Sequence, residues 1–283
     1  MTTTPLQEIA DALAAGSAIP YLGPDVLGLE PVDVPSTPAD LVKMLTAKVS
    51  VPHKIRNNLT AAAQFIENFK HRKTIVSLME EAYRPGVQPN ALHRYLAGLT
   101  KKPLLIVDTW YDDAMAKVLA SRGNWGQIQG VSQSEHFGSW VNYFDDQGNP
   151  VEAIEADTWH TVLYKPLGSI APARNFIISD SDYVEVLTEI DIQTPIPPRV
   201  QELRTGSHFL FLGCRFSNQL TRTYARQVMK RSSDKHWAVI EGPLTRMELK
   251  FLEEQNITRI DLPLAQFVEW LQTGKMSQAL AAA

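Results

Sequence analysis

The last third of the chain alternates between apolar runs and helical patterns, and this alternation limits the possible folds most strongly. In chain order the segments are the strand candidate 208–213, the helical pattern 217–230, the strand candidate 236–241, the pattern 245–255, the strand candidate 257–262 and the pattern 264–272. Strands separated by helices of this length form a parallel sheet with right-handed crossovers and helices on both faces. We therefore predict a Rossmann-like α/β fold with a mostly parallel sheet.

The first two thirds add further strands, a helical segment and a region of different character. Apolar runs at 18–22 and 103–108 predict buried strands, and helical spacing dominates 37–100. From 123 to 164 Gly, Gln and Ser are frequent, and the sequence DDQGNP indicates a hairpin turn. The predicted units are a Rossmann-like core made of 1–36, 101–122 and 165–283, a helical subdomain at 37–100, and a small β-rich insertion at 123–164.

Composition argues against several functional classes. The chain has 27 Lys and Arg against 31 Asp and Glu, a net charge of −4, and no long basic run, so we expect no nucleic-acid partner. A single cysteine excludes a cysteine-rich zinc site, and the seven histidines lack metal-binding spacing. The sequence has no signal peptide and no apolar run near the ~20 residues that span a bilayer. We expect a soluble, cytoplasmic protein without zinc or membrane contact.

The candidate site lies where four apolar runs end, because ligands of parallel sheets bind at the carboxyl ends of the strands. These ends read GPDVL from residue 23, DTWYD from 108, KPLGS from 165 and GCRFSN from 213. In this order they resemble the motifs GAGxS, TxNYD, KxHG and GxSx of the bacterial sirtuin-like domains that bind or hydrolyse NAD. The resemblance extends from about residue 20 to about residue 271 and implies the same fold.

The resemblance also implies a site for NAD or an ADP-ribose-like nucleotide, although no cofactor follows from the residues alone. Thr109 and Asp112 are the candidates for a catalytic role. Arg215 is added to the binding candidates because it is a charge directly beyond a buried strand. The candidate cofactor-binding residues are Gly23, Thr109, Asp112, Lys165, Gly168, Ser169, Gly213, Arg215 and Ser217.

Five positions depart from the family motifs. Pro24, Asp25 and Leu27 stand in the first turn where the family has Ala, Gly and Ser, while Trp110 replaces an asparagine and Leu167 a histidine. Proline removes a backbone donor from a turn that binds phosphate through N–H groups, and Asp25 adds a repelling charge. Leucine cannot serve as a general base, which typically contributes about 10²- to 10⁴-fold. Because Trp110 and Leu167 are large and apolar, we expect them to fill the pocket.

Several candidates have two interpretations. Asp112 either orients a ligand or is a first-turn acid of the helix that follows. Lys165 either meets an anion or is a solvated lysine at a strand end, and Arg215 either forms a local salt bridge or faces a ligand. We interpret Cys214 as a small buried hydrophobe and His93 as a packing or capping residue.

The leading hypothesis is a catalytically inactive sirtuin-like domain that acts as a binding or assembly module, with a protein partner or by self-association. Trp125, Phe137 and Trp140 either contact such a partner or cover the pocket. The resemblance makes protein deacetylation the least favoured activity, since the sirtuin-like deacetylases carry a four-cysteine zinc module.

The alternative hypothesis is an enzyme that binds or hydrolyses NAD or a related nucleotide, of NADase type and with the role in phage defence that the resemblance implies. Its rearranged site would use Thr109, Asp112, Lys165 and Ser217. Nucleotide binding without hydrolysis is the third hypothesis.

Overall fold

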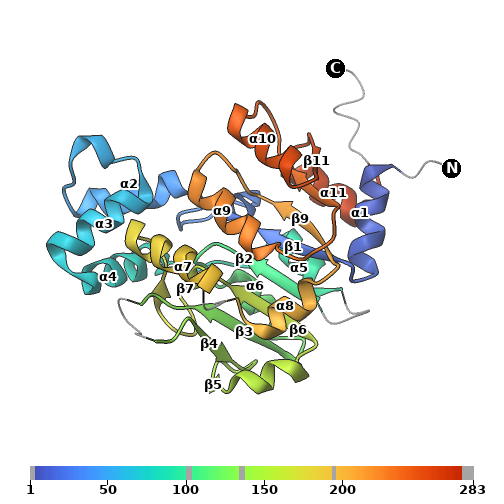
Figure 1. Cartoon of the computed structure of the whole chain (residues 1–283), viewed down its shortest axis with the longest axis horizontal. Helices are drawn as coiled ribbons and strands as arrows, with labels where there is room; N and C mark the ends of the chain where they lie inside the picture. The colour runs from blue at the N-terminus through green and yellow to red at the C-terminus, as the bar shows by residue number, and fades with distance from the viewer. Residues whose placement is uncertain (1–3, 100–103, 134–137, 193–195, 276–283) are drawn as a thin grey trace.

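A nine-stranded sheet forms the centre of the molecule (Figure 1). The computed structural model describes residues 4–99, 104–133, 138–192 and 196–275. In spatial order the strands are β11 (Ile257–Ile260), β10 (His236–Val239), β9 (His208–Leu212), β1 (Ala18–Leu22), β2 (Leu104–Asp108), β6 (Thr161–Lys165), β3 (Trp125–Gly130), β4 (Val141–Phe144) and β5 (Pro150–Val151). Neighbours from β11 to β3 are parallel, and β4 and β5 extend one edge antiparallel. The predicted mostly parallel α/β sheet is confirmed.

Helices cover both faces of this sheet, as predicted (Figure 1). One face packs against α1 (Pro5–Ala14), α5 (Ala91–Ala97), α6 (Ala114–Leu119) and α11 (Leu264–Thr273). The other face packs against α7 (Asp180–Ile192), α8 (Pro198–Arg204), α9 (Gln219–Val228) and α10 (Arg246–Glu254). Every residue of β1 is buried, with Ala18 and Leu22 in the first core and Ile19 and Tyr21 in the second. This alternation follows from the two-residue period of a strand.

Three further helices form a lobe beside the sheet, at the left of Figure 1. They are α2 (Pro38–Lys48), α3 (Leu59–Lys70) and α4 (Arg72–Tyr83), and each contacts the other two. Arg72 links the lobe to α7, because its Nη1 lies 2.8 Å from the carboxylate of Asp182. The predicted helical subdomain also includes α5, which packs instead against α6 and α11.

The region predicted as a β-rich insertion, 123–164, contributes strands to the main sheet. β3 pairs with β6 in parallel, and the predicted hairpin turn joins β4 to β5. Trp125 is buried in β3, so it is not the exposed aromatic that a partner contact requires. Trp140 is half-buried, and its contact with a partner stays a prediction; Phe137 lies outside the described residues. The division of the chain into three units stays a prediction.

The segment between β6 and β9 contains elements that no sequence signal indicated. A two-stranded sheet, β7 (Gly168–Ser169) and β8 (Asn175–Phe176), follows β6 and leads into α7 and α8. Outside that segment, a 3₁₀ helix that the sequence also did not indicate, η1 (Pro24–Leu29), follows β1 directly. Of the helices in the described chain, none has the length and apolar character needed to cross a membrane.

Candidate functional site

A cleft of about 530 Å³ opens at the carboxyl ends of β1, β2 and β9. This volume lies within the range of small-molecule sites, roughly 300–1,000 Å³. The cleft is lined by Tyr21, Gly23, Pro24, Asp25, Thr37, Pro38, Ala39, Asn57, Asn58, Leu59, Thr60, Thr109, Trp110, Tyr111, Leu167, Tyr183, Cys214, Arg215, Phe216, Ser217, Asn218, Thr221 and Tyr224. Asp25 and Arg215 are the charged side chains of this lining, and the others are polar, aromatic or apolar.

Three helices begin at the cleft. Thr37, Asn58 and Asn218 line it and are the N-cap residues of α2, α3 and α9. A helix N-terminus carries a partial positive charge, so three of them add positive potential to the cleft, and Arg215 adds a cation that is paired with Glu248. Asp25 is the acidic residue of the lining. Burial raises the pKa of its carboxyl group, and the charge of Arg215 opposes that rise.

The first turn of the cleft has no free donors of the kind that a phosphate-binding turn needs. Gly23 N donates to the carbonyl of Leu212 at 2.8 Å, and Asp25 N donates to the carbonyl of Gly213 at 3.2 Å. Pro24 has no N–H group. The end of β9 therefore occupies the amides that a dinucleotide phosphate would need.

The two glycines of this region serve close packing of the backbone. A Cβ atom on Gly23 would lie 2.3 Å from the carbonyl oxygen of Gly213 and 2.7 Å from Cys214 Sγ. Gly213 has a φ of +65°, and a Cβ there would lie 2.6 Å from Val26 N. The match of Gly23 and Gly213 to the family motifs thus has a structural cause in the contact between the turns after β1 and β9.

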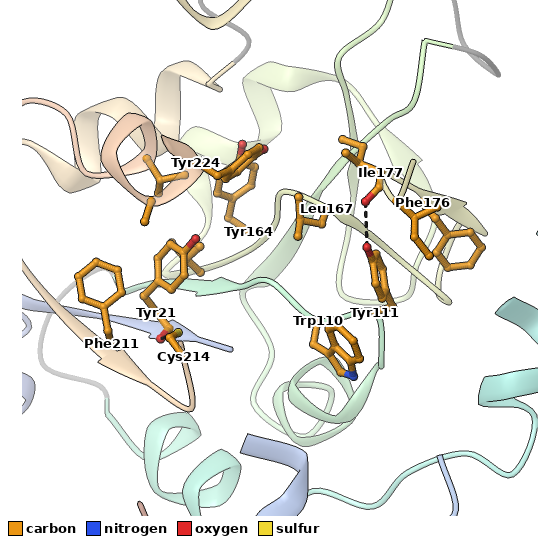
Figure 2. Packing of buried hydrophobic residues seen from close by; sticks show 14 of the residues in the cluster. Tyr21, Trp110, Tyr111, Tyr164, Leu167, Phe176, Ile177, Phe211, Cys214 and Tyr224 are labelled. Atoms are coloured by element: carbon orange, nitrogen blue, oxygen red, sulfur yellow. Dashed lines mark hydrogen bonds between the residues drawn. The ribbon is translucent and has the colours of Figure 1, made fainter. Parts of the chain in front are cut away.

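Trp110 and Leu167 form part of the wall, and an open cleft remains beside them. The indole of Trp110 is buried, and its Nε1 donates to the carbonyl of Pro35 at 2.8 Å. The expectation that the two side chains fill the pocket is therefore wrong for Trp110, which is turned into the wall. Figure 2 shows Trp110 and Tyr111 beside Leu167, with the Tyr111 hydroxyl donating to the carbonyl of Ile177 at 2.9 Å.

The polar residues of the central motifs form a buried network behind this wall. Lys165 Nζ donates to Asp108 Oδ2 and to the carbonyl of Asp112, both at 2.8 Å, and its side chain is 1% exposed. Ser169 Oγ donates to the same Asp112 carbonyl at 3.2 Å. Asp112 Oδ1 accepts from Ala114 N at 2.8 Å, but Asp112 precedes the N-cap residue Asp113, so it is not the first-turn acid of α6 that one interpretation expected. The network fixes the backbone that carries the cleft residues Thr109, Trp110 and Tyr111.

Burial shifts the pKa values of three groups in this region, Asp108, His93 and Cys214. Desolvation raises the pKa of Asp108 to about 6, and the neighbouring ammonium of Lys165 limits that rise. Burial lowers the pKa of His93 to about 4. His93 Nδ1 accepts from Asn90 N at 3.2 Å and completes a capping box at the start of α5, which confirms its predicted capping role. Cys214 is 7% exposed, as predicted, and burial raises the pKa of its thiol.

The structure separates the predicted site residues into two groups. Gly23, Thr109, Arg215 and Ser217 line the cleft. Asp112, Lys165, Gly168, Ser169 and Gly213 are outside the cleft lining. Lys165 is not the solvated lysine of one interpretation, since it is buried and meets the carboxylate of Asp108 within the protein. Arg215 forms the expected local salt bridge, with Glu248, and also lines the cleft.

Sequence reasoning missed Asp108 and Glu248, the partners of the two cations. A signal existed for the first, because an acid ends β2 and a base ends the neighbouring strand β6. For Glu248, the sequence T-x-x-E at 245–248 indicates a capping box but not a bond to Arg215. Within residues 4–99, 104–133, 138–192 and 196–275, no group of three or more His, Cys, Asp or Glu side chains is arranged to hold a metal ion.

Comparison with known proteins agrees with this architecture. A search of the curated proteins finds no match to the chain. The family model described as the SIR2-like domain matches residues 104–260, a segment that runs from β2 through the cleft-lining end of β9 to β11. This match covers more than half of the chain, and the protein belongs to the SIR2-like domain family.

Proposed function

We propose that this protein is a catalytically inactive SIR2-like domain that acts as a binding module and holds an anionic ligand such as ADP-ribose in its cleft. The observation that carries the proposal is the pairing of an open cleft with a wall that lacks a suitable base. Leu167 and Trp110 stand where the resemblance implies a histidine and an asparagine. Neither side chain can accept a proton, so the general base that the resemblance implies at the position of Leu167 is missing.

The charges of the cleft support an anionic ligand. Three helix N-termini and Arg215 line the cleft, together with aromatic side chains that suit a ring. The occupied amides after β1 argue against the usual phosphate turn, so the anionic group of the ligand would lie on the Arg215 side.

The alternative, an NADase-type enzyme with a rearranged site, is favoured by one observation. Asp25 lines the cleft, and burial raises the pKa of its carboxyl group, which brings the group closer to the range of a general base. Of the rearranged set named from the sequence, Thr109 and Ser217 line the cleft, whereas Asp112 and Lys165 do not.

One experiment separates these functions. Purified protein is incubated with NAD while free nicotinamide and ADP-ribose are followed, and thermal unfolding is measured with ADP-ribose. We expect no turnover, together with stabilisation by about 2.7 kcal/mol at about 100 times Kd. Turnover that Asp25→Asn abolishes would establish the enzyme instead. Absence of both turnover and stabilisation would contradict nucleotide binding of either kind.

Replacing Asp25 with asparagine is expected to strengthen the binding of ADP-ribose about fivefold. The change removes the carboxylate of the cleft, and about 1 kcal/mol is typical of a partly screened repulsion at this range. Isothermal titration calorimetry measures the effect. Asp157→Asn is the control, because Asp157 is exposed in η3 (Ala153–Thr158) and outside the cleft lining. Weaker binding by Asp25→Asn would mean that Asp25 contacts the ligand as an acceptor.

Self-association or a protein partner, and location in the cytoplasm, stay predictions from the sequence. The mass of the purified protein in solution, measured by light scattering over a range of concentrations, tests self-association directly.

A further inference from the structure

Arg215 leaves the end of β9 and is fixed in place by Glu248 of α10. Its Nε donates to Glu248 Oε1 at 2.9 Å, and its Nη2 donates to Glu248 Oε2 at 3.1 Å and to the carbonyl of Pro243 at 3.1 Å. The guanidinium and the carboxylate thus form a bidentate pair, which fixes the orientation of the guanidinium as well as its distance from the carboxylate.

Glu248 is itself held from several sides. Its side chain is completely buried and accepts from Thr245 N and Thr245 Oγ1 at 2.9 Å and from Phe216 N at 3.2 Å. Burial raises the pKa of Glu248, but the hydrogen bonds from Arg215 and Thr245 and the charge of Arg215 outweigh this and lower the pKa to about 2, so the carboxylate stays charged at neutral pH. A carboxylate with four such partners cannot rotate with the arginine, and the guanidinium therefore keeps one orientation.

The third nitrogen of Arg215 is left for another partner. Within the part of the chain that the structure describes, Nη1 makes no hydrogen bond, unlike Nε and Nη2. The side chain is 42% exposed and lines the cleft, next to Ser217 and the N-cap residue Asn218. A salt bridge that only joined two surface elements would not need a completely buried carboxylate. The pair of Arg215 and Glu248 has one, and it presents the guanidinium of Arg215 to the cleft.

We propose that Arg215 is the residue that selects and anchors the anionic group of the ligand, and that Glu248 is the positioning residue that aims it. The inference rests on the proposed binding function and names the group of the ligand that is recognised, a phosphate or diphosphate. The anionic end of the ligand lies at Arg215 and the start of α9 rather than at the closed amides after β1. Electropositive helix ends attract such a group, and the fixed guanidinium gives it direction.

The simplest competing explanation is that the Arg215–Glu248 pair only joins β9 to α10. Such a structural pair would affect stability without changing which ligands bind. The two roles therefore differ in the binding of anions measured on folded protein and in the dependence of that binding on salt.

The test uses inorganic pyrophosphate and ADP-ribose as probes, with binding followed by calorimetry at several salt concentrations. Folding of each variant is checked by circular dichroism at the temperature of the titration. We expect Arg215→Met to weaken the binding of both probes at least tenfold and to reduce its salt dependence, because the anchoring charge is gone. Arg215→Lys keeps the charge without the fork and should restore part of the affinity, and Glu248→Gln should weaken binding about fivefold with Arg215 still present.

Arg226→Met is the matched control. Arg226 pairs with Glu254 on the surface, both side chains are 44% exposed, and it does not line the cleft. Its binding of both probes should equal that of the unchanged protein.

The outcomes separate the inference from the function on which it rests. If ADP-ribose binds equally well to the unchanged protein and to folded Arg215→Met, the anchor is wrong and the binding function stands. If pyrophosphate binds through Arg215 but ADP-ribose does not bind, the anchor stands and the proposed nucleotide ligand is wrong. If the unchanged protein binds neither probe, both proposals are overturned.

Discussion

Lys165→Met is expected to lower the free energy of unfolding by about 3–5 kcal/mol at pH 8, the typical cost of removing one partner from a buried ion pair. Lys165 and Asp108 are 1% and 4% exposed, so water cannot replace the lost ammonium. The same change frees the Asp112 carbonyl from one of its hydrogen bonds. Denaturation by urea or guanidinium, followed by circular dichroism, measures the loss.

The loss should depend on pH, and its direction follows from Asp108. Burial raises the pKa of this carboxyl group to about 6 in the folded protein, above its ordinary value of 3.8. The folded state therefore favours the protonated form, and the contribution of Asp108 to stability is complete below pH 3.8 and is lost as the pH rises through about 6. Without Lys165 the pKa rises further, so we expect a smaller loss at pH 5 than at pH 8.

Two further variants test this explanation. Lys165→Met combined with Asp108→Asn removes both charges but keeps an acceptor for Trp110 N, which Asp108 Oδ1 binds at 3.1 Å. The double variant should recover at least half of the lost stability and lose the added dependence on pH. Lys48→Met removes a surface partner of Glu81 and should cost less than about 1 kcal/mol. Equal losses for Lys165→Met and Lys48→Met would contradict the role of the buried pair.

Sequence patterns were sufficient for the sheet wherever a strand is an unbroken apolar run. The strands β2, β9 and β10 are largely apolar, and each was predicted within a few residues. β11 was predicted from its place in the alternation, although it contains Thr258 and Arg259. β3 was missed because WGQIQG reads as a loop, with glycine and two glutamines in six residues. Both glutamines are buried, and Gln127 and Gln129 donate to the carbonyls of Ala171 and Ala173 after β7. A polar strand becomes possible when a distant segment supplies acceptors, and a local pattern cannot contain that information.

The site was located from the sequence more accurately than its side chains were assigned. The rule that ligands bind at the carboxyl ends of parallel strands placed Gly23, Thr109, Arg215 and Ser217 around one cleft. The rule does not say which side chain points into the opening. Lys165 ends its strand as expected, but its ammonium donates to Asp108 and not into the cleft. The reason is that a buried ammonium without a carboxylate partner would be very unfavourable. Opposite charges at the ends of adjacent strands were the signal for this pair.

Gly23→Ala is expected to lower the free energy of unfolding by about 3 kcal/mol or more, at the upper end of the effects of overpacking. The added Cβ would lie 2.3 Å from the carbonyl oxygen of Gly213, and neither the backbone of β1 nor that of β9 can move aside without breaking ladder hydrogen bonds. The φ of Gly23 is −102°, which alanine adopts easily, so contact and not backbone strain causes the loss. Chemical denaturation of the purified variant measures it.

Gly28→Ala is the matched control within the same turn, and it also separates packing from ligand binding. A Cβ on Gly28 would lie 3.9 Å from Ser36 Oγ, an ordinary contact, so its stability should change by less than about 1 kcal/mol. If Gly23 were needed only to let a phosphate approach, Gly23→Ala would fold as stably as Gly28→Ala and would lose only the binding of ADP-ribose. A large loss of stability in the absence of any ligand, confined to Gly23→Ala, is the result that follows from the contact with Gly213, and a stable Gly23→Ala protein would contradict it.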